Sequence, residues 1–380
     1  MSKTAVIVGY ARSPFHFAAK GALATVRPDD LAAAVINGLL DKTGVEGREI
    51  EDLILGCAFP EGEQGFNVAR LVVNIANLPL SIGGVTVNRF CGSSMQAIHQ
   101  AAGAIQCGSG EAFICAGVES MSRVPMGGFN PLPNPELVKT FPQAYIAMGE
   151  TAENLARKYA IPRAEQEKFA LSSQQKAVLA REGGRFKEEI IPITTPDGTT
   201  IDSDGCIRAE TTLEGLASLP LAFDKDGTVT PGTASPLTDG ASATLVVSEE
   251  FAKEHGLTVL AKIRSTAVSG CAPEIMGIGP VEASKKAMTR AGITIKDIDV
   301  IELNEAFAVQ AMSVLQELEA NMDTVNLDGG AIALGHPLGA SGARITGKAA
   351  SLLQRQKKKF ALATMCIGGG QGIATVLEAA

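Results

Sequence analysis

Short, dense apolar runs alternate along this chain with longer stretches in which apolar residues recur every three or four positions. The dense runs, among them AVIVGYA, DLILG, AFICAG and ATLVV, are rich in β-branched and small residues, which predicts strands buried on both faces. The longer stretches, such as residues 30–43 and 280–291, predict helices. Strands that alternate with helices indicate a layered α/β architecture.

The order of these elements repeats along the chain. A helix followed by a strand at residues 30–56 has a counterpart at residues 280–303, in which Asp52 corresponds to Asp299. The strand EAFICAG corresponds to KFALATM, with Phe113 matching Phe360 at the same interval along the chain. The sequence therefore predicts two equivalent halves related by a pseudo-twofold axis.

The first half contains a long additional segment, richer in Pro, Gly, Asp and Glu, with a helical portion at residues 150–182. Insertions of this size in a compact core are usually functional. We expect three parts: an N-terminal half at residues 1–120 and 238–258, an inserted loop domain at residues 121–237, and a C-terminal half at residues 259–380.

The net charge and the composition limit which binding partners and which cellular compartment we expect for this protein. A formal net charge of -8 argues against nucleic acid or an anionic membrane, which both attract positive surfaces. No apolar run reaches the ~18 residues of a membrane helix, and the N-terminus has the pattern of a strand, not of a signal peptide. The seven cysteines form no CxxC pair, which favours reduced thiols over disulfides or zinc. We expect a cytoplasmic protein.

Cys91 is the first candidate for chemistry. In VNRFCGSSMQAI it follows a predicted strand and precedes a predicted helix that Gly108 ends. A thiol at the start of a helix faces free backbone N–H groups and the positive end of the helix dipole, so we expect a lowered pKa. The alternative is a small buried residue without a chemical role.

His336 occupies the position in the second half that Cys91 occupies in the first. It lies in GHPLGASG, a loop shaped by three glycines and a proline. If the halves are related by a twofold axis, the two loops meet at the centre of the molecule. A satisfied core histidine is the alternative, and His16, His99 and His255 have the patterns of structural residues.

Two further segments place polar groups after strands, where sites on α/β sheets form. Cys366 begins CIGGGQG after the strand FALATM, and N–H groups in such a glycine-rich turn can bind an anion. Asn304 follows the strand VIEL and is either a site residue or a helix cap.

These blocks, NRFCGSSMQAI, NEAF, GHPLGASGAR and CIGGGQG, resemble in this order the signature blocks of the thiolases, and the similarity extends over essentially the whole chain. The variants are most similar to degradative bacterial 3-ketoacyl-CoA thiolases. The resemblance implies duplicated βαβαβαββ halves in a five-layer α-β-α-β-α core with an inserted loop domain. It also implies CoA-dependent cleavage of 3-ketoacyl-CoA to acetyl-CoA, the last step of β-oxidation, with CoA as a substrate and no cofactor.

The resemblance also assigns roles to residues. Cys91 is expected to be the nucleophile, His336 its base and Cys366 the acid that protonates the departing enolate. Asn304, through a water, is expected to help His336 stabilise the enolate oxygen, and the N–H groups of Cys91 and Gly368 to stabilise the tetrahedral oxyanion. The positions that match CoA contacts of the family are Met148, Arg208, Phe223, Ser235, Met276, Ala306 and Phe307.

Several alternatives remain open from the sequence. A short-chain acetoacetyl-CoA thiolase is one, although Ala147 stands where short-chain members usually have His, which favours longer chains. Others are a catalytically silent CoA- or lipid-binding scaffold, a cysteine peptidase and a decarboxylating condensing enzyme. The family resemblance implies a homodimer or homotetramer, or a complex with an enoyl-CoA hydratase/3-hydroxyacyl-CoA dehydrogenase.

Overall fold

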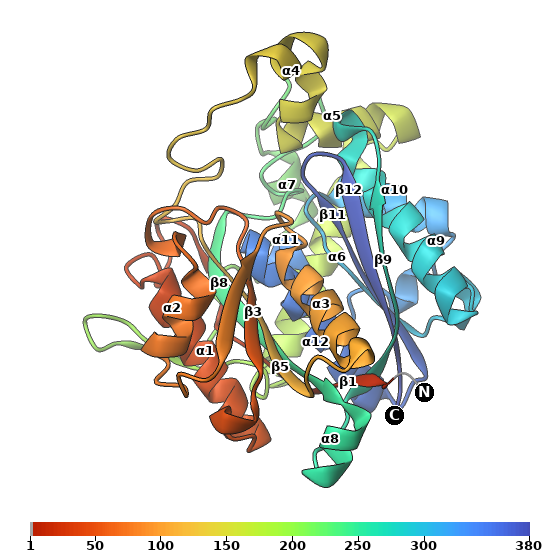
Figure 1. Cartoon of the computed structure of the whole chain (residues 1–380). Coiled ribbons are helices and arrows are strands. Elements are labelled where there is room, and N and C mark those ends of the chain that lie inside the picture. Colours follow the sequence, from red (N-terminus) through yellow and green to blue (C-terminus); the bar gives the residue numbers. More distant parts are fainter. Residues whose placement is uncertain (1–2) are drawn as a thin grey trace.

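The computed structural model describes residues 3–380, which form a layered α/β molecule. Two helices lie in the middle, sheet strands lie on both sides of them, and further helices cover the outer faces (Figure 1). This arrangement confirms the predicted five-layer order of helix, sheet, helix, sheet and helix. Over residues 3–380, no helix is long and apolar enough to cross a membrane.

The strands of the two halves join in one ten-stranded sheet, in which the main order is β10-β11-β12-β9-β1-β8-β5-β3-β4. Within this sheet the two halves are joined by the pairing of β1 with β9 over two residues, Val6 with Lys262 and Ile7 with Ala261. The strands are β1 Ala5–Arg12, β2 His16–Phe17, β3 Asp52–Gly56, β4 Gly83–Val87, β5 Ala112–Ser120, β8 Thr238–Ser248, β9 Ala261–Gly270, β10 Val300–Leu303, β11 Phe360–Ile367 and β12 Gln371–Glu378.

Three apolar cores explain the layers. One packs α1 and α2 on the first-half strands, and another packs α9 and α10 on the second-half strands. The third surrounds α3 and α12 with side chains from both sets of strands. The helices of the two halves are α1 Pro28–Thr43, α2 Val68–Ile75, α3 Ser93–Cys107, α8 Glu249–Glu254, α9 Gly279–Ala291, α10 Ala308–Leu318, α11 Ala331–Leu334 and α12 Leu338–Gln356.

The pairing of strands confirms the predicted duplication. In the first half Asp52 of β3 pairs with Phe113 of β5. In the second half the N–H of Asp299 donates to the carbonyl of Phe360 at 2.9 Å, so the corresponding residues are again partners. Two equivalent βα units thus face each other across α3 and α12.

The central helices approach closely because small residues line their contact. A methyl group on Gly342 of α12 would lie 2.3 Å from the backbone nitrogen of Met95 in α3. A methyl group on Gly117 of β5 would lie 2.2 Å from the carbonyl oxygen of Gly339. Real Cβ atoms do not approach backbone so closely, so these positions require glycine. The starts of α3 and α12 are thereby held against each other.

The segment between β5 and β8 carries α4 Pro135–Thr140, α5 Met148–Tyr159, α6 Arg163–Glu182, β6 Ile193–Thr194, β7 Thr200–Ile201 and α7 Leu213–Ala217. Its α4 projects at the top of the molecule, and α5 and α6 lie against the second half (Figure 1). Buried ion pairs fix the later part of the segment to the core. Arg12 of β1 binds Asp204 with both terminal nitrogens, and Lys348 of α12 binds Glu189 at 2.8 Å.

The glycine contact between the central helices can be tested with one pair of variants. Gly342→Ala should lower the free energy of unfolding by about 1–3 kcal/mol, because the new methyl overpacks the contact with Met95. Gly103→Ala is the matched control in α3, since no atom lies within 4 Å of the added methyl. It should raise stability by up to about 1 kcal/mol through helix propensity. Urea unfolding followed by circular dichroism measures both, and equal effects would contradict the contact.

Candidate functional site

The turn before α3 presents Cys91 two residues ahead of the first helical residue, Ser93. The hydroxyl of Ser93 accepts a hydrogen bond from the N–H of Arg89 at 2.9 Å and donates to the carbonyl of Phe90 at 2.5 Å. Phe90 has a φ of 43°, in the left-handed region that is unfavourable for a bulky residue. Backbone strain of this kind concentrates at functional sites.

The electrostatics of Cys91 correct the sequence-based expectation. Burial in the protein, followed by the negative charge of Glu119, raises the pKa of Cys91 to about 12. The backbone N–H groups of Gly368 and of Cys91 itself lower the pKa and oppose this rise, but they are the smaller effect. The expected lowering of the pKa was therefore wrong, because desolvation outweighs the dipole of α3. At rest, Cys91 is a neutral thiol.

His336 lies between α11 and α12, and three hydrogen bonds fix its position. Its backbone N–H donates to the hydroxyl of Thr238 at 3.0 Å. On the ring, Nδ1 lies 2.5 Å from Oγ of Ser341 and Nε2 lies 3.3 Å from Nδ2 of Asn304. Because an amide nitrogen only donates, Nε2 is the acceptor and Nδ1–H donates to Ser341. The ring nitrogen without a proton is thus Nε2.

Burial, aided by the charge of Arg344, lowers the pKa of His336 to about 3. The imidazole is neutral at physiological pH and can accept a proton. His336 combines this protonation state with a fixed tautomer, which is the form that a general base requires.

Asn304 directly follows β10, and its N–H donates to the carbonyl of Thr364 at 3.1 Å. It is not a helix cap, because α10 begins at Ala308 after Phe307, so that alternative was wrong. The side chain is completely buried, and its Oδ1 atom has no hydrogen-bond partner among the described residues. Asn304 therefore presents an acceptor beside the imidazole of His336.

Cys366 lies inside β11, paired with Gly372 of β12, and not beyond the strand as the sequence suggested. The strand continues one residue further, and the turn is formed by Gly368, Gly369 and Gly370. Burial raises the pKa of Cys366 well above its ordinary value, and the neighbouring Cys91 adds to the rise. The turn thus delivers the N–H of Gly368 to Cys91 beside a second neutral thiol.

The structure brings the loops of the two halves together at the contact of α3 and α12. The N–H of Ala343 in α12 donates to the hydroxyl of Ser94 in α3 at 2.8 Å. Cys91 precedes the first helix start by two residues and His336 precedes the second by the same distance. The predicted meeting of equivalent loops is thus observed.

Most residues predicted to contact CoA also cluster next to Cys366. Met276, Ala306, Phe307 and Cys366 share one apolar core, against which Met148 packs. Phe223 contacts Phe307 edge to face at 5.8 Å, and the hydroxyl of Ser235 donates to the carbonyl of Ala306. Arg208 lies apart from this cluster, with Nη2 3.4 Å from the carbonyl of Ile332, and burial lowers its pKa.

A methyl group on Gly368 would lie 3.6 Å from the sulfur of Met148 and 3.7 Å from the ring of Phe90. These two side chains make the immediate surroundings of Gly368 apolar.

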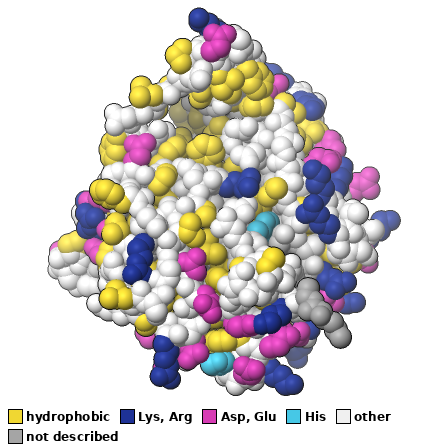
Figure 2. Space-filling model, in the orientation of Figure 1, with side chains coloured by type: hydrophobic (Ala, Val, Ile, Leu, Met, Phe, Trp, Pro, Cys, Tyr) yellow, Lys and Arg dark blue, Asp and Glu magenta, His cyan; other side chains and the backbone are white. Residues whose placement is uncertain are grey.

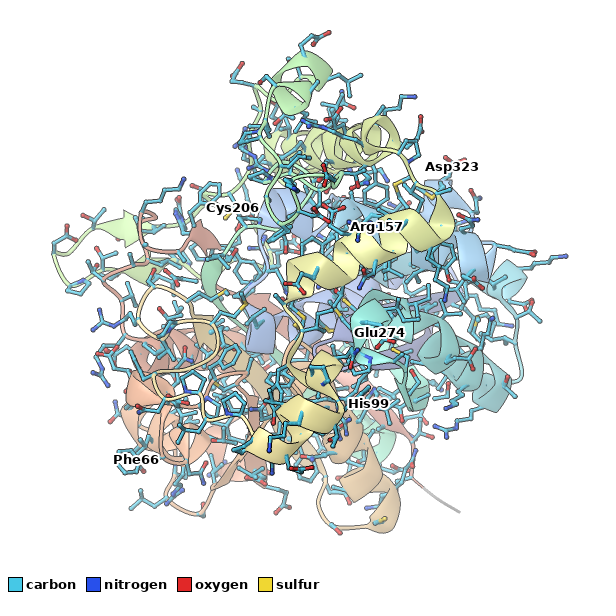
Figure 3. The ribbon with its side chains drawn as sticks, turned by 90° about the horizontal axis from the view of Figure 1, so that it is seen from above. Phe66, His99, Arg157, Cys206, Glu274 and Asp323 are labelled. Carbon is cyan, nitrogen blue, oxygen red and sulfur yellow. The ribbon has the colours of Figure 1, made fainter. Side chains whose placement is uncertain are left out.

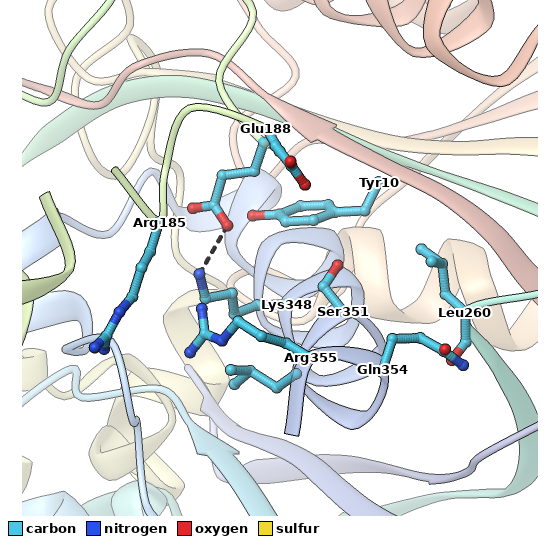
Figure 4. A pocket seen from close by; sticks show the side chains of 10 residues that line it. Tyr10, Arg185, Glu188, Leu260, Lys348, Ser351, Gln354 and Arg355 are labelled. Atoms are coloured by element: carbon cyan, nitrogen blue, oxygen red, sulfur yellow. Dashed lines mark hydrogen bonds and ion pairs between the residues drawn. The ribbon is translucent and has the colours of Figure 1, made fainter. Parts of the chain in front are cut away.

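A cavity of about 490 Å³ lies elsewhere, between β1, α12 and the segment after α6 (Figure 4). Five of its ten lining residues are charged, and two of these, Lys348 and Glu189, form an ion pair at 2.8 Å. It contains none of the residues predicted for the site.

The remaining histidines and cysteines behave as structural residues. His16 contacts the carbonyl of Ser203, His99 contacts the hydroxyl of Thr375, and His255 stacks on Phe251. All seven cysteines are free, as the sequence predicted.

Sequence reasoning missed Ser341, Thr238 and Glu119. Ser341 and Thr238 orient His336, and Glu119 is a buried carboxylate near Cys91. Ser341 could have been noticed within the loop GHPLGASG. An acidic residue at the end of the buried run AFICAGVES was the only signal for Glu119.

Comparisons with known proteins identify the family of the chain. The thiolase N-terminal domain family matches residues 5–250, and the thiolase C-terminal domain family matches residues 257–379. The chain is 50% identical to a 3-ketoacyl-CoA thiolase of Vibrio cholerae and 46% identical to one of Bacillus subtilis, over 99% of each chain. Human mitochondrial 3-ketoacyl-CoA thiolase in complex with CoA superposes with a TM-score of 0.92 and 38% identity, over 100% of this chain and 98% of that one.

The neutral state of His336 predicts a pH dependence of stability. The unfolded imidazole binds a proton below its ordinary pKa of about 6.5, whereas the folded one stays neutral down to a pKa of about 3. Stability contributed by this group is therefore complete above pH 6.5 and is lost as the pH falls below it. Comparing His336→Asn with the unchanged protein by urea unfolding between pH 7 and 5 isolates the effect, since His99 remains in both.

The variant should lose less stability over this range, by roughly 1 kcal/mol per pH unit below pH 6. Parallel stability curves for the two proteins would show that folding does not lower the pKa of His336, which would contradict a buried neutral imidazole.

Proposed function

Because the chain belongs to the thiolase family, its activity is acyl transfer between thioesters, and we propose that Cys91 is the residue that carries the acyl group. The reaction is the CoA-dependent cleavage of 3-ketoacyl-CoA to acetyl-CoA and a shortened acyl-CoA. One observation supports the assignment to Cys91 above all others. The backbone N–H groups of Gly368 and Cys91 both favour the anionic form of this sulfur, and a second thiol neighbours it.

In the first step, the sulfur of Cys91 attacks the C3 carbonyl carbon of the substrate. The thiol proton passes to Nε2 of His336, the ring nitrogen without a proton, where it replaces the hydrogen bond from Nδ2 of Asn304. The carbonyl oxygen becomes an oxyanion, which the N–H groups of Cys91 and Gly368 stabilise. Since both groups are neutral at rest, proton transfer accompanies attack and does not precede it.

In the second step, the bond between C2 and C3 breaks and the C3 carbonyl reforms as a thioester on Cys91. The electron pair of the broken bond forms the enolate of acetyl-CoA. Its oxygen is stabilised by the protonated His336 and by a water that Oδ1 of Asn304 holds, and its carbon takes the proton of Cys366. Acetyl-CoA then leaves.

In the third step, the thiol of CoA gives its proton to the thiolate of Cys366 and attacks the acyl group on Cys91. The tetrahedral adduct collapses, Cys91 leaves as a thiolate and takes back the proton held by His336. Both cysteines and the histidine are thereby restored, so no cofactor enters the reaction. The thioester on Cys91 matches substrate and product in energy, which keeps both transfers reversible.

CoA acts in this proposal as a substrate that lies along the apolar cluster of Met148, Met276, Ala306 and Phe307. Phe223 and Ser235 border that cluster. The guanidinium of Arg208 is the group suited to a phosphate or adenine edge. Family membership leaves no basis for the peptidase or condensing-enzyme alternatives.

The proposal is tested by thiolysis of a chain-length series, from acetoacetyl-CoA to long 3-ketoacyl-CoA, followed through loss of the enolate absorbance. Medium and long substrates should turn over faster, because Ala147 and the apolar groups around Gly368 favour a long acyl chain. Cys91→Ala should remain folded and lose at least about 10³-fold in kcat, since the nucleophile is gone.

Three results would count against this assignment. Preference for acetoacetyl-CoA would move the protein to the short-chain group, and cleavage by Cys91→Ala at the normal rate would remove Cys91 from its role. No cleavage at any chain length would favour the CoA-binding scaffold.

We further propose that the protein is a homodimer or homotetramer that pairs through the edge strand β4. Edge strands without a partner are association sites, and apolar side chains surround this one. Figure 3 shows Phe66 at the periphery of the molecule, and it is 94% exposed. The other exposed apolar side chains near this edge are Leu71, Ile75, Leu80, Val85 and Phe90.

A second apolar surface lies around α4, where hydrophobic side chains gather at the top of the molecule (Figure 2). Its members are Met126, Phe129, Leu132, Leu137, Val138, Phe141 and Tyr145. This surface would serve either a tetramer or a complex with the enzymes of the preceding steps. The cytoplasm is the compartment that we propose.

Light scattering after size exclusion tests the β4 interface. Leu80→Glu should shift the assembly to a smaller species, because a charge then faces the partner's apolar surface. Leu179→Glu is the control, since Leu179 is 63% exposed on α6, away from the edge. An assembly that is monomeric before substitution, or one equally affected by both variants, would contradict the proposed interface.

A further inference from the structure

Glu119 is a buried carboxylate at the end of β5, only 1% exposed, whose oxygens receive five hydrogen bonds. One oxygen accepts from the N–H groups of Ala58 at 2.8 Å and Gly339 at 2.9 Å. The other accepts from the N–H of Phe59 at 3.2 Å, the amide of Gln64 at 2.9 Å and the thiol of Cys57 at 3.6 Å.

All five partners donate to Glu119 in this arrangement, which favours its carboxylate form. Burial raises the pKa of Glu119, whereas the backbone and amide donors oppose that rise. Within residues 3–380, no Lys, Arg or His side chain forms an ion pair with it. The site therefore contains an isolated negative charge that is compensated by dipoles alone.

The donors of Glu119 come from both halves of the active centre. Ala58 and Phe59 contact the turn that carries Cys91: the amide of Asn88 donates to the carbonyl of Ala58, and the rings of Phe59 and Phe90 are 5.9 Å apart. Gly339 stands three residues after His336, in the first turn of α12. One carboxylate thus connects the loops of the nucleophile and the base.

The charge of Glu119 also acts directly on Cys91. The titratable groups on the elements around the sulfur are Glu119 on β5, Cys366 on β11 and the neutral His336 before α12. Arg89, on the same turn, is occupied by the side chains of Gln96 and Gln371. The carboxylate is therefore the one group here that opposes formation of a thiolate by its charge.

We propose that Glu119 is a positioning residue that holds the loops of Cys91 and His336 in register, and that its negative charge adds to the effect of burial in keeping Cys91 a neutral thiol until substrate binds. This inference rests on the proposed role of Cys91. In the resting enzyme the nucleophile is protected from stray electrophiles. During attack the negative charge develops on the carbonyl oxygen of the substrate. A free thiolate next to the charge of Glu119 is therefore not formed.

The test measures alkylation of Cys91 by iodoacetamide as a function of pH, with the Cys91 peptide quantified by mass spectrometry. This readout needs no substrate, so it is independent of whether the thiolase reaction is assigned correctly. Glu119→Gln should lower the midpoint pH of alkylation by about one unit or more, because the repelling charge is gone. Its kcat should fall about tenfold or more, because the loops lose their common anchor.

Two further variants separate charge from structure. The double variant Gln64→Glu, Glu119→Gln returns a carboxylate to the same cluster. Its midpoint pH of alkylation should lie close to that of the unchanged protein, and its kcat should recover in part. Glu63→Gln is the matched control: this neighbouring carboxylate pairs with Arg27 and Arg123 and should affect neither quantity.

An unchanged midpoint in Glu119→Gln would overturn the electrostatic part of the proposal, and an unchanged kcat would overturn the positioning part. If Glu119→Gln does not fold, the double variant decides. A folded double variant with a near-normal midpoint supports the proposal, and one that is unfolded or has a lowered midpoint contradicts it.

Discussion

The close contact between α3 and α12 is the constraint on which the rest of the structure depends. Each helix comes from one of two equivalent halves, and each is preceded by a loop that carries a reactive residue. Because glycine lies at the contact, the helix starts touch at backbone distance, as Gly342 and Met95 show. A wider contact would leave Cys91 and His336 on separate surfaces. The duplication of the fold is therefore also what assembles the site.

Burial at this contact determines the chemistry of the site as much as its geometry does. Desolvation raises the pKa of Cys91 and lowers the pKa of His336, so both are neutral before substrate arrives. A neutral pair differs from the thiolate–imidazolium pair of some cysteine enzymes, because here charge forms only as the carbonyl is attacked. The N–H groups of Gly368 and Cys91 are already aimed at the reacting sulfur, and preorganised donors of this kind stabilise charge without reorganisation.

The sequence predicted the layered fold, the duplication and the meeting of the loops of Cys91 and His336, because all three follow from periodicity and from a constant interval between matching residues. It did not predict the raised pKa of Cys91, since that rise comes first from burial and then from the charge of Glu119, and both depend on tertiary packing that the loop sequence does not reveal. The sequence around Asn304 was likewise not enough to decide whether this residue caps a helix or belongs to the site. The answer depended on where α10 begins and on the tertiary contact with His336.

The most direct measurement is the mass of the covalent intermediate. The protein is mixed with a long 3-ketoacyl-CoA in the absence of free CoA, quenched in acid and digested, and the peptides are analysed together with the released acetyl-CoA. The account predicts one acyl group per chain, two carbons shorter than the substrate acyl chain, on the peptide of Cys91, with an equal amount of acetyl-CoA. Acetyl-CoA release with the acyl group on Cys366, or with no acyl group on the protein, would contradict it.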